Sequence, residues 1–586
     1  MTSSPSFVPS CLCVRELLDQ HFDTAFAAPD GIAKLRELIL TLAMQGKLVE
    51  QDPNDPPASV LLKEIEAERK RGSHEGTKTR RKEKLPPIKP EEVPYELPQG
   101  WEWVRLGEIC SYIQRGTGPK YVDFSTRRVI SQKCVRWYGL DLDPARYIDP
   151  TSLKKYEPIR FLRVGDLLWN STGTGTIGRA CLVPQTLEGV EIVADSHVTV
   201  VRPIDVSPMF LWRWVQSPTV QNEIEESASG TTNQIELNTS TVINHLIPLP
   251  PLPEQDRIVA RIDQLMARCD ELEELHKERE EKRLAVHAAA VKQLLDAPTG
   301  SAWDSIQQHF GELYTVKENV DELRKAILQL AVMGHLVPQD PNDPPASELL
   351  KEIEAEKQRM VKAGKIKKPK PLPPIKREDV PYELPQGWEW VRLGAITEYN
   401  GRKNISGDEI TPDTWLLDLE DIEKGTSRIL NRVKFSERQS KSTKSTFQKG
   451  DVLYGKLRPY LDKVVVADSD GVCTTEIVPI VPLNGIHSEF LRWLLKRPAF
   501  LAHVNSLMYG VKMPRLGTDD AVTSIHPLPP LPEQHRIVAR IDQLMVLCDT
   551  LDYQIEAATD KRTELLNALM ANLSKEAAQP SQPRTS

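Results

Sequence analysis

The sequence predicts an α+β protein, built as a tandem duplication in which two mixed domains and two long helices are related by pseudo-two-fold symmetry. The segment 93–107 (Val-Pro-Tyr-Glu-Leu-Pro-Gln-Gly-Trp-Glu-Trp-Val-Arg-Leu-Gly) recurs without change at 380–394. A second segment, 248–266, recurs at 527–545 with a single difference. Between these shared segments the two copies barely align. A constant frame therefore surrounds two different interiors, in copies that run over about 14–297 and 302–575.

The segment 248–266 predicts a stiff hinge followed by a long helix. Its prolines favour polyproline II and cannot continue a preceding element. From Glu254 the apolar residues step by four and three, the a/d pattern of a helix that packs along another helix. Two matching seams predict that the helices pack on each other, and two unrelated amphipathic helices are the alternative. The predicted seams are Ile258, Ile262, Leu265, Cys269 and Leu272, and Ile537, Ile541, Leu544, Cys548 and Leu551.

Each copy is predicted to contain the same elements in the same order. Two helices come first, and Gly46 and Gly334 suit the C-terminal end of the first helix in each copy. A basic, proline-rich linker, a mixed domain and the hinge with its helix follow. The predicted segments are 1–92 (helical region and basic linker), 93–250 (first mixed domain), 251–380 (long helix, helical region and basic linker), 381–529 (second mixed domain), 530–575 (C-terminal long helix) and 576–586 (disordered tail).

Short strands and helices are predicted inside the mixed domains. The strands are expected at 164–169, 193–201, 449–454 and 475–481, and the helices at 210–215 and 490–495. Both copies keep a pair of tryptophans at the start of the domain, Trp101 with Trp103 and Trp388 with Trp390. Because these residues stay constant while the interiors differ, we expect them to anchor the core.

The bulk composition limits the possible functions. The 586 residues carry 75 Lys and Arg against 83 Asp and Glu, a net charge of −8, which argues against a general nucleic-acid coat. No apolar run reaches about 18 residues and no signal-peptide pattern opens the chain, so a cytoplasmic protein without a membrane span is expected. The eight cysteines form neither a zinc spacing nor a disulfide framework, and Cys269 and Cys548 are expected to be small apolar core residues.

Motifs that resemble catalytic sites have structural explanations. Gly173, Gly175 and Gly178 fit the dinucleotide-binding spacing, but the following residues predict a strand where that site needs a helix, so we expect a glycine hairpin. Asn54-Asp-Pro-Pro57 and its copy at 342–345 lack the aromatic residue of the methyltransferase tetrad and are expected to start helices. No catalytic residue and no metal ligand is predicted.

Two stretches of the acidic chain are locally basic. Residues 115–163 contain eleven Lys and Arg against five acidic residues, or +6, and residues 428–463 contain ten against three, or +7. Cations can hold phosphates, while Arg and Gln can read base edges. Equivalent stretches in both copies favour a DNA-binding role over a merely solvated face. The predicted DNA-binding residues are Lys120, Tyr121, Arg127, Arg128, Gln132, Lys133, Arg136, Arg179, Arg402, Lys403, Lys434, Lys441, Lys444, Lys456, Arg458, Lys512 and Arg515.

Nearly the whole chain resembles the specificity subunit of type I restriction–modification systems. The motifs that carry the resemblance are the segment 97–107 with its copy, the Gly-Asp-(Leu/Val)-Leu segments, and both Pro-Leu-Pro-Pro-Leu-Pro-Glu-Gln hinges with their helices. The resemblance implies two target-recognition domains, each reading one half of an asymmetric bipartite duplex DNA target. It also implies that the long helices pack antiparallel and fix the spacer between the half-sites.

The resemblance further implies that the chain has no catalytic centre and no cofactor of its own. Two modification (methyltransferase) subunits and restriction (translocase–nuclease) subunits would be its partners, and these would hold AdoMet, ATP and Mg²⁺. The helical segments 14–71 and 302–360 are expected to dock a modification subunit. Two other classes stay open from the residues alone: a stand-alone DNA methyltransferase or nuclease, and a protein-only coiled-coil scaffold.

Overall fold

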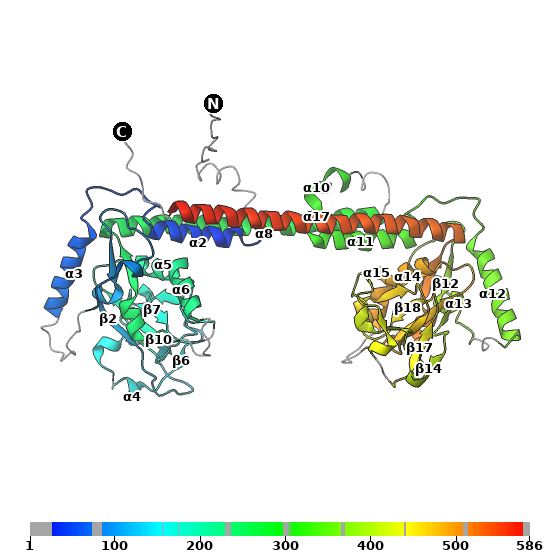
Figure 1. Cartoon of the computed structure of the whole chain (residues 1–586), viewed down its shortest axis with the longest axis horizontal. Helices are drawn as coiled ribbons and strands as arrows, with labels where there is room; N and C mark the ends of the chain where they lie inside the picture. The colour runs from blue at the N-terminus through cyan, green and yellow to red at the C-terminus, as the bar shows by residue number, and fades with distance from the viewer. Residues whose placement is uncertain are drawn as a thin grey trace, which may run out of the picture. The chain divides into compact units, whose positions relative to one another are not determined.

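The computed structural model describes residues 26–72, 85–154, 156–173, 175–228, 236–296, 304, 306–364, 370–438, 441–507 and 514–577. The contacts divide the chain into a first unit, residues 1–278 with 558–586, and a second unit, residues 279–557. The two longest helices, α8 (Leu252–Asp296) and α17 (Leu531–Ala577), each cross from one unit to the other (Figure 1). Of the predicted tail, residues 576 and 577 end α17 and the rest lies outside the described residues.

Among its described residues, the first unit combines helices with four small sheets. Strands β1 and β11 pair antiparallel, so the start and the end of the mixed domain lie side by side. A four-stranded sheet has the order β2-β10-β7-β8, a three-stranded sheet has the order β6-β3-β9, and β4 pairs with β5. The strands are β1 (Glu102–Arg105), β2 (Cys110–Arg115), β3 (Arg128–Ile130), β4 (Val135–Arg136), β5 (Gly139–Leu140), β6 (Arg146–Tyr147), β7 (Leu167–Asn170), β8 (Ala180–Leu182), β9 (Val193–Ala194), β10 (Val198–Pro203) and β11 (Leu246–Leu249). The described helices besides α8 and α17 are α2 (Gly31–Met44), α3 (Ala58–Gly72), α4 (Pro150–Leu153), α5 (Pro208–Gln216), α6 (Pro218–Ala228) and α7 (Thr239–Asn244).

The second unit repeats this frame around a different interior. Strands β12 and β22 form the closing pair, and a four-stranded sheet has the order β13-β21-β18-β19. The remaining sheet has five strands, in the order β14-β17-β20-β15-β16. The strands are β12 (Glu389–Arg392), β13 (Thr397–Tyr399), β14 (Asn404–Ile405), β15 (Trp415–Leu417), β16 (Val433–Lys434), β17 (Lys444–Phe447), β18 (Val452–Gly455), β19 (Val464–Val466), β20 (Gly471–Thr474), β21 (Ile477–Pro482) and β22 (Ile525–Leu528). The described helices besides α8 and α17 are α10 (Phe310–Leu313), α11 (Lys317–Val332), α12 (Ala346–Lys362), α13 (Leu393–Ile396), α14 (Ser488–Lys496), α15 (Pro498–Ser506) and α16 (Thr518–Thr523).

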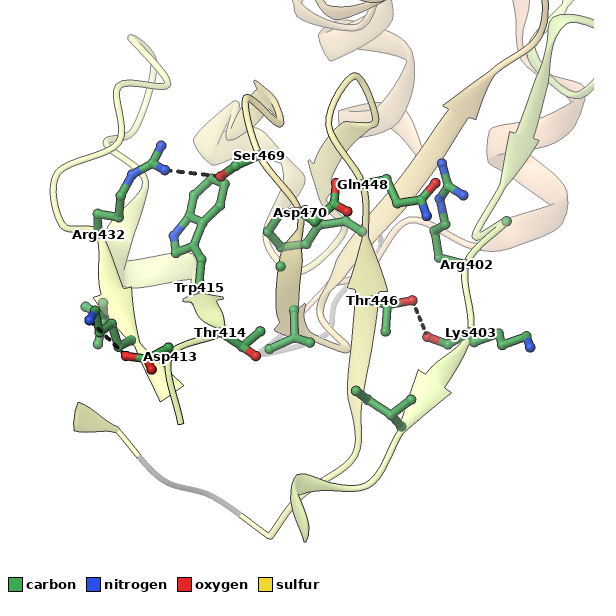
Figure 2. A pocket seen from close by; sticks show the side chains of 17 residues that line it. Arg402, Lys403, Asp413, Thr414, Trp415, Arg432, Thr446, Gln448, Ser469 and Asp470 are labelled. Carbon is green, nitrogen blue, oxygen red and sulfur yellow. Dashed lines mark hydrogen bonds and ion pairs between the residues drawn. The ribbon is translucent and has the colours of Figure 1, made fainter. Parts of the chain in front are cut away.

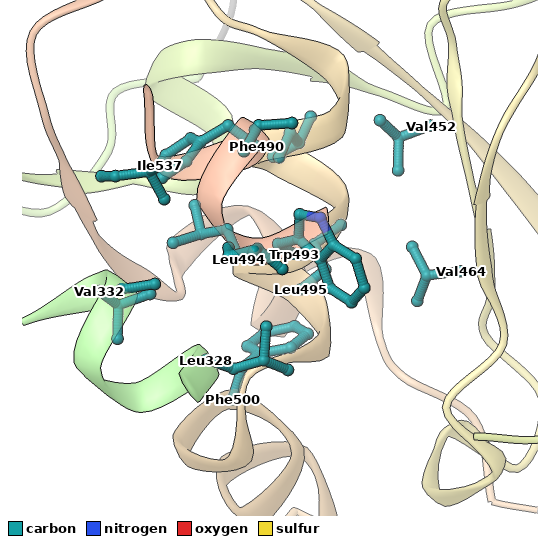
Figure 3. Close-up of a cluster of buried hydrophobic side chains, with 14 of the residues drawn as sticks. Leu328, Val332, Val452, Val464, Phe490, Trp493, Leu494, Leu495, Phe500 and Ile537 are labelled. Carbon is teal, nitrogen blue, oxygen red and sulfur yellow. The ribbon is translucent and has the colours of Figure 1, made fainter. Parts of the chain in front are cut away.

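The residues of the predicted seams are buried or half-buried, and the buried ones of α8 and of α17 lie in two different cores. The two long helices share one of these cores, because Leu294 of α8 belongs to the same core as Ile537 of α17. Ile258, Ile262 and Cys269 belong to the core that α8 shares with α2 and α5. Ile537 and Ile541 belong to the core that α17 shares with α11 and α14 (Figure 3). The a/d faces are therefore covered by the shorter helices and the mixed domain of the same unit, which offer apolar surface of their own.

Ion pairs fix the shorter helices on the long ones in the same way twice. Arg36 of α2 donates to Asp270 and Glu273 of α8, both at 2.7 Å. Arg324 of α11 forms ion pairs at 2.7 and 2.8 Å with two aspartates of α17, Asp549 and Asp552. The repeated sequence thus produces a repeated three-way junction of helix, helix and domain.

The proline hinge is held by side chains that the repeat keeps. Gln255 accepts a hydrogen bond from the Ser207 backbone N–H at 2.9 Å and donates to the Pro250 carbonyl at 3.0 Å. Arg257 pairs with Asp55 at 2.6 Å, just before α3 begins, which confirms the helix start predicted after the Asp-Pro-Pro segment. Gln534, Arg536 and Asp343 repeat these contacts in the second unit. Each long helix is therefore clamped to its own domain where it begins.

The strand predicted at 193–201 is two strands in different sheets. β9 joins the three-stranded sheet and β10 the four-stranded one. The break lies at Asp195, whose side chain accepts a hydrogen bond from the His197 N–H at 2.9 Å and turns the chain. Among the described helices, none combines the length and the apolar character that crossing a membrane would need.

Candidate nucleic-acid interface

The second unit carries an open hollow of about 1020 Å³ on its five-stranded sheet (Figure 2). The segments that meet there are far apart in the sequence, because the sheet order places β14 and β17 beside β20, β15 and β16. The hollow is lined by both hydrogen-bond donors and hydrogen-bond acceptors, and reading of base edges uses both. Its polar lining consists of Arg402, Lys403, Asp413, Thr414, Arg432, Lys434, Thr446, Gln448, Ser469 and Asp470.

Two cations of the hollow are held in place by their neighbours. The Arg432 guanidinium lies 4.2 Å from the centre of the Trp415 ring and pairs with the Asp468 carboxylate. Lys434 pairs with Asp413 at 2.9 Å. Lys403 is exposed. The paired cations retain free donor N–H groups, so the hollow suits directed hydrogen bonds better than bulk electrostatic attraction.

Arg402, also predicted to bind DNA, lines the hollow and is paired with a buried carboxylate. Its guanidinium donates two 2.7 Å hydrogen bonds to Asp451, which is 1% exposed. The first unit has the same arrangement, with Arg202 donating twice at 2.7 Å to buried Asp166. Each aspartate comes from a Gly-Asp-(Leu/Val)-Leu segment, so this motif supplies the buried acceptor of a bidentate pair.

The basic residues predicted in the first unit gather on the three-stranded sheet and the segments beside it. The Arg146 guanidinium lies 3.8 Å from the centre of the Tyr121 ring, and the Arg128 guanidinium 5.2 Å from that of Tyr147. Lys133 is exposed. Three predicted cations have carboxylate partners: Lys120 with Asp149 at 3.7 Å, Arg127 with Glu191 at 2.8 Å and Arg136 with Asp141 at 3.7 Å.

The glycine-rich segment forms the predicted hairpin. It connects the antiparallel strands β7 and β8, and Gly173, Gly175 and Gly178 all have positive φ. Gln132, predicted to read DNA, accepts hydrogen bonds from this segment at two oxygens, its carbonyl from Asn170 at 3.0 Å and its Oε1 from Thr176 at 3.3 Å. Arg179 directly precedes β8 and is half-buried.

The remaining predictions in the second unit have mixed outcomes. Lys441 and Arg458 are exposed, and Lys456 is half-buried. Arg515 is paired with both oxygens of Glu476, at 2.9 and 3.0 Å. Lys444 contradicts the prediction of a surface contact, because it is only 7% exposed within the sheet strand β17. Lys512 lies outside the described residues.

Comparison with known proteins identifies the family of this chain. A family model described as "Type I restriction modification DNA specificity domain" matches residues 98–281. The Type I restriction enzyme EcoAI specificity subunit of Escherichia coli is 35% identical over 569 residues, which cover 92% of this chain and 93% of that protein. This chain belongs to the type I restriction enzyme specificity subunits. The resemblance read from the sequence is confirmed.

Other specificity subunits are similar over comparable lengths. The EcoEI specificity subunit of Escherichia coli is 31% identical over 577 residues, covering 92% of this chain and 93% of that protein. The crystal structure of the HsdS subunit from Thermoanaerobacter tengcongensis is 20% identical, with a TM-score of 0.41, over 81% of this chain and 98% of that one.

The hollow of this specificity subunit contains residues that sequence reasoning missed. Thr414, Trp415, Gln448, Ser469 and Asp470 line it, and none was singled out beforehand. The one feature of the sequence that could have pointed to them is their location in the part of the second copy that does not align with the first copy. Because the first unit has no five-stranded sheet among its described residues, comparison of the two copies could not reveal them.

Proposed function

We propose that this specificity subunit directs a type I restriction–modification complex to an asymmetric, bipartite duplex DNA sequence, and that each unit reads one half. The observation that carries the proposal is the repeat of frame contacts around unlike interiors. The hinge pairs Arg257–Asp55 and Arg536–Asp343 both measure 2.6 Å, whereas the interiors contain a three-stranded and a five-stranded sheet. Two readers on one scaffold would give two different half-sites.

In this proposal the hollow is the reading surface of the second unit. Arg432, Gln448 and Thr446 would offer donors and acceptors to base edges in the major groove, while exposed Lys403 would contact a phosphate. In the first unit the sheet that carries Arg128 and Arg146 would have the corresponding role. The long helices would set the spacer between the two half-sites.

The proposed partners are two modification subunits, and restriction subunits would bind to that complex. The proposed localisation is the cytoplasm. This chain would contribute no catalytic group. AdoMet would be bound by the modification subunits, and ATP with Mg²⁺ by the restriction subunits. The proposed docking sites for modification subunits are the helical segment that contains α2 and α3 and the helical segment that contains α11 and α12.

Selection from a random duplex pool by the assembled complex tests the proposal. The expected result is enrichment of one split motif with a fixed gap. Exchange of residues 93–247 for the same region of a relative should then change one half of the motif and leave the other. Enrichment of nothing would favour a protein-only scaffold. Methyl transfer or DNA cleavage by the purified chain alone would favour a stand-alone enzyme.

A further inference from the structure

Each unit presents an exposed tyrosine two residues after an arginine. Arg136-Trp137-Tyr138 forms the turn between β4 and β5, and the Tyr138 side chain is 79% exposed. Arg458-Pro459-Tyr460 lies between β18 and β19, and Tyr460 is 46% exposed. A tyrosine offers a flat apolar ring with a polar tip, and an arginine two residues away can pair with an anion, so these two segments, the Arg-x-Tyr tips, are candidate contact points for a polyanionic partner.

The two tips lie in unrelated parts of the interiors, yet the same position of the frame contacts both. Helices α5 and α14 end at Gln216 and Lys496, and in both copies a proline follows two residues later. Gln216 donates from Nε2 to the Trp137 carbonyl at 3.2 Å, inside the first tip. Lys496 donates from Nζ to Asp462 Oδ2 at 2.7 Å, two residues beyond the second tip.

Lys496 is almost enclosed and binds several acceptors. It is 6% exposed, and Nζ also donates to the Gly425 carbonyl at 2.7 Å and to Ser427 Oγ at 2.8 Å. Arg458 and Asp462, at the two ends of the turn, both have a φ of +50°, which is unfavourable for residues with a side chain. The Lys496 contacts therefore stabilise the turn at Asp462, directly after the second tip.

The helix ends that hold the tips are themselves fixed. Around α14, Phe490 and Leu494 belong to the core that includes Val332 of α11 and Ile537 of α17 (Figure 3). On α5, Arg213 donates to Gln216 Oε1 at 2.9 Å and pairs with Asp263 of α8 at 2.6 Å. Each tip is thus connected through one shorter helix to the long helix of its unit.

We propose that the two Arg-x-Tyr tips contact the DNA duplex, and that Gln216 and Lys496 are positioning residues for them. The arginine would bind a phosphate or a guanine edge, and the tyrosine ring would pack against the deoxyribose and base at one step. The inference rests on the proposed function and deepens it, because it names an element in each unit that touches each half-site.

The test uses the assembled complex and the duplex that the wild-type complex selects from a random pool. Tyr138→Ala and Tyr460→Ala should each weaken binding at least about tenfold. A control, Tyr553→Ala, removes a tyrosine ring of α17 that is 72% exposed, and should leave the affinity unchanged. Wild-type affinity in both tip variants would overturn the inference but not the proposed function. Failure of the wild-type complex to select any motif would overturn both.

The positioning role has its own readout, discrimination against single mismatches in one half-site. Lys496→Met should reduce discrimination in the second half-site alone, and Gln216→Ala in the first alone. Lys496→Gln keeps a donor at the position where the other copy has Gln216, and should recover part of the loss. Thermal unfolding identifies variants that are simply misfolded. A folded Lys496→Met protein with unchanged discrimination would contradict the positioning role.

Discussion

Trp101 donates its indole N–H to a carboxylate oxygen of Glu254 at 3.0 Å. This hydrogen bond joins the residue directly before β1 to the first turn of α8. Trp388 and Glu533 repeat the bond at 2.9 Å in the second unit. Burial raises the pKa of both carboxyl groups. The folded state therefore binds a proton at these groups more tightly than the unfolded chain, so their charge costs stability as the pH rises through the folded pKa.

Replacement of Glu254 should separate its hydrogen bond from its charge. Glu254→Gln keeps an acceptor for the Trp101 N–H and removes the buried charge, so at pH 8 its stability should equal or exceed that of the wild type. Glu254→Ala leaves the indole N–H unpaired and should cost about 1–3 kcal/mol. Denaturant unfolding of the full chain measures both, and Trp101→Phe in each background isolates the pair. Equal losses for Gln and Ala would contradict this account.

Loss of the aspartate should lower the free energy of unfolding by different amounts in the two bidentate Arg–Asp pairs. Asp166→Ala strands Arg202, whose side chain is 10% exposed, and should cost about 3–5 kcal/mol. Asp451→Ala should cost less, because the Arg402 side chain is 25% exposed and can turn to water. Calorimetric unfolding compares them. The double replacement of Asp166 and Arg202 by apolar residues should recover most of the loss, since no charge is then stranded.

Acidification should destabilise the first unit through His245. Burial lowers the pKa of this imidazole to about 4, and its Nε2 accepts the Trp214 indole N–H at 3.2 Å. The unfolded chain binds the proton more readily, so the stability is present above about pH 6.5 and is lost as the pH falls toward 4. The loss should reach about 3 kcal/mol at most. Unfolding from pH 7 to 4.5 should show a shallower decline for His245→Asn, and parallel curves would refute the assignment.

Matched insertions in the long helices should change the spacer. The helices cross between the units at residues 278/279 of α8 and 557/558 of α17. Four added residues in each lengthen a helix by about 6 Å with little net rotation, close to two base pairs. Random-pool selection should show a gap altered by one or two base pairs and unchanged half-sites. A two-residue insertion turns the helix by about 200° and should impair folding. A fixed gap in an active four-residue variant would exclude the helices as the ruler.

Exposed cations of the interiors should contribute to the salt dependence of DNA binding. Each of Lys133, Lys403 and Lys441 that contacts a phosphate should lower the slope of log K against log salt by about 1 when changed to Gln. The affinity should fall to a similar extent for all sequences. Lys561→Gln, an exposed lysine on α17, serves as the control. A triple variant with the wild-type slope would remove these residues from the interface.

The sequence by itself determined the duplication, the family, the α+β class and the extent of the long helices. Those features depend on local patterns, namely heptad spacing, proline hinges and capping glycines such as Gly46, with a φ of +68°. It also identified the glycine hairpin, because strand signals on both sides exclude a helix. The burial of Trp101 and Cys269 followed from their place in repeated segments.

Only the tertiary structure decided what the seams pack on and which cations are available to a ligand. The a/d pattern of Ile258 and Ile262 indicates that one face of the helix is buried, but it does not identify the element that covers this face. In the structure, α2 packs in the core that contains both residues. The sequence likewise treats Arg402, Lys444 and Lys403 alike, as cations predicted to bind DNA. The fold pairs the first with Asp451, buries the second and exposes the third, because burial and ion pairing depend on neighbours that are distant in the sequence.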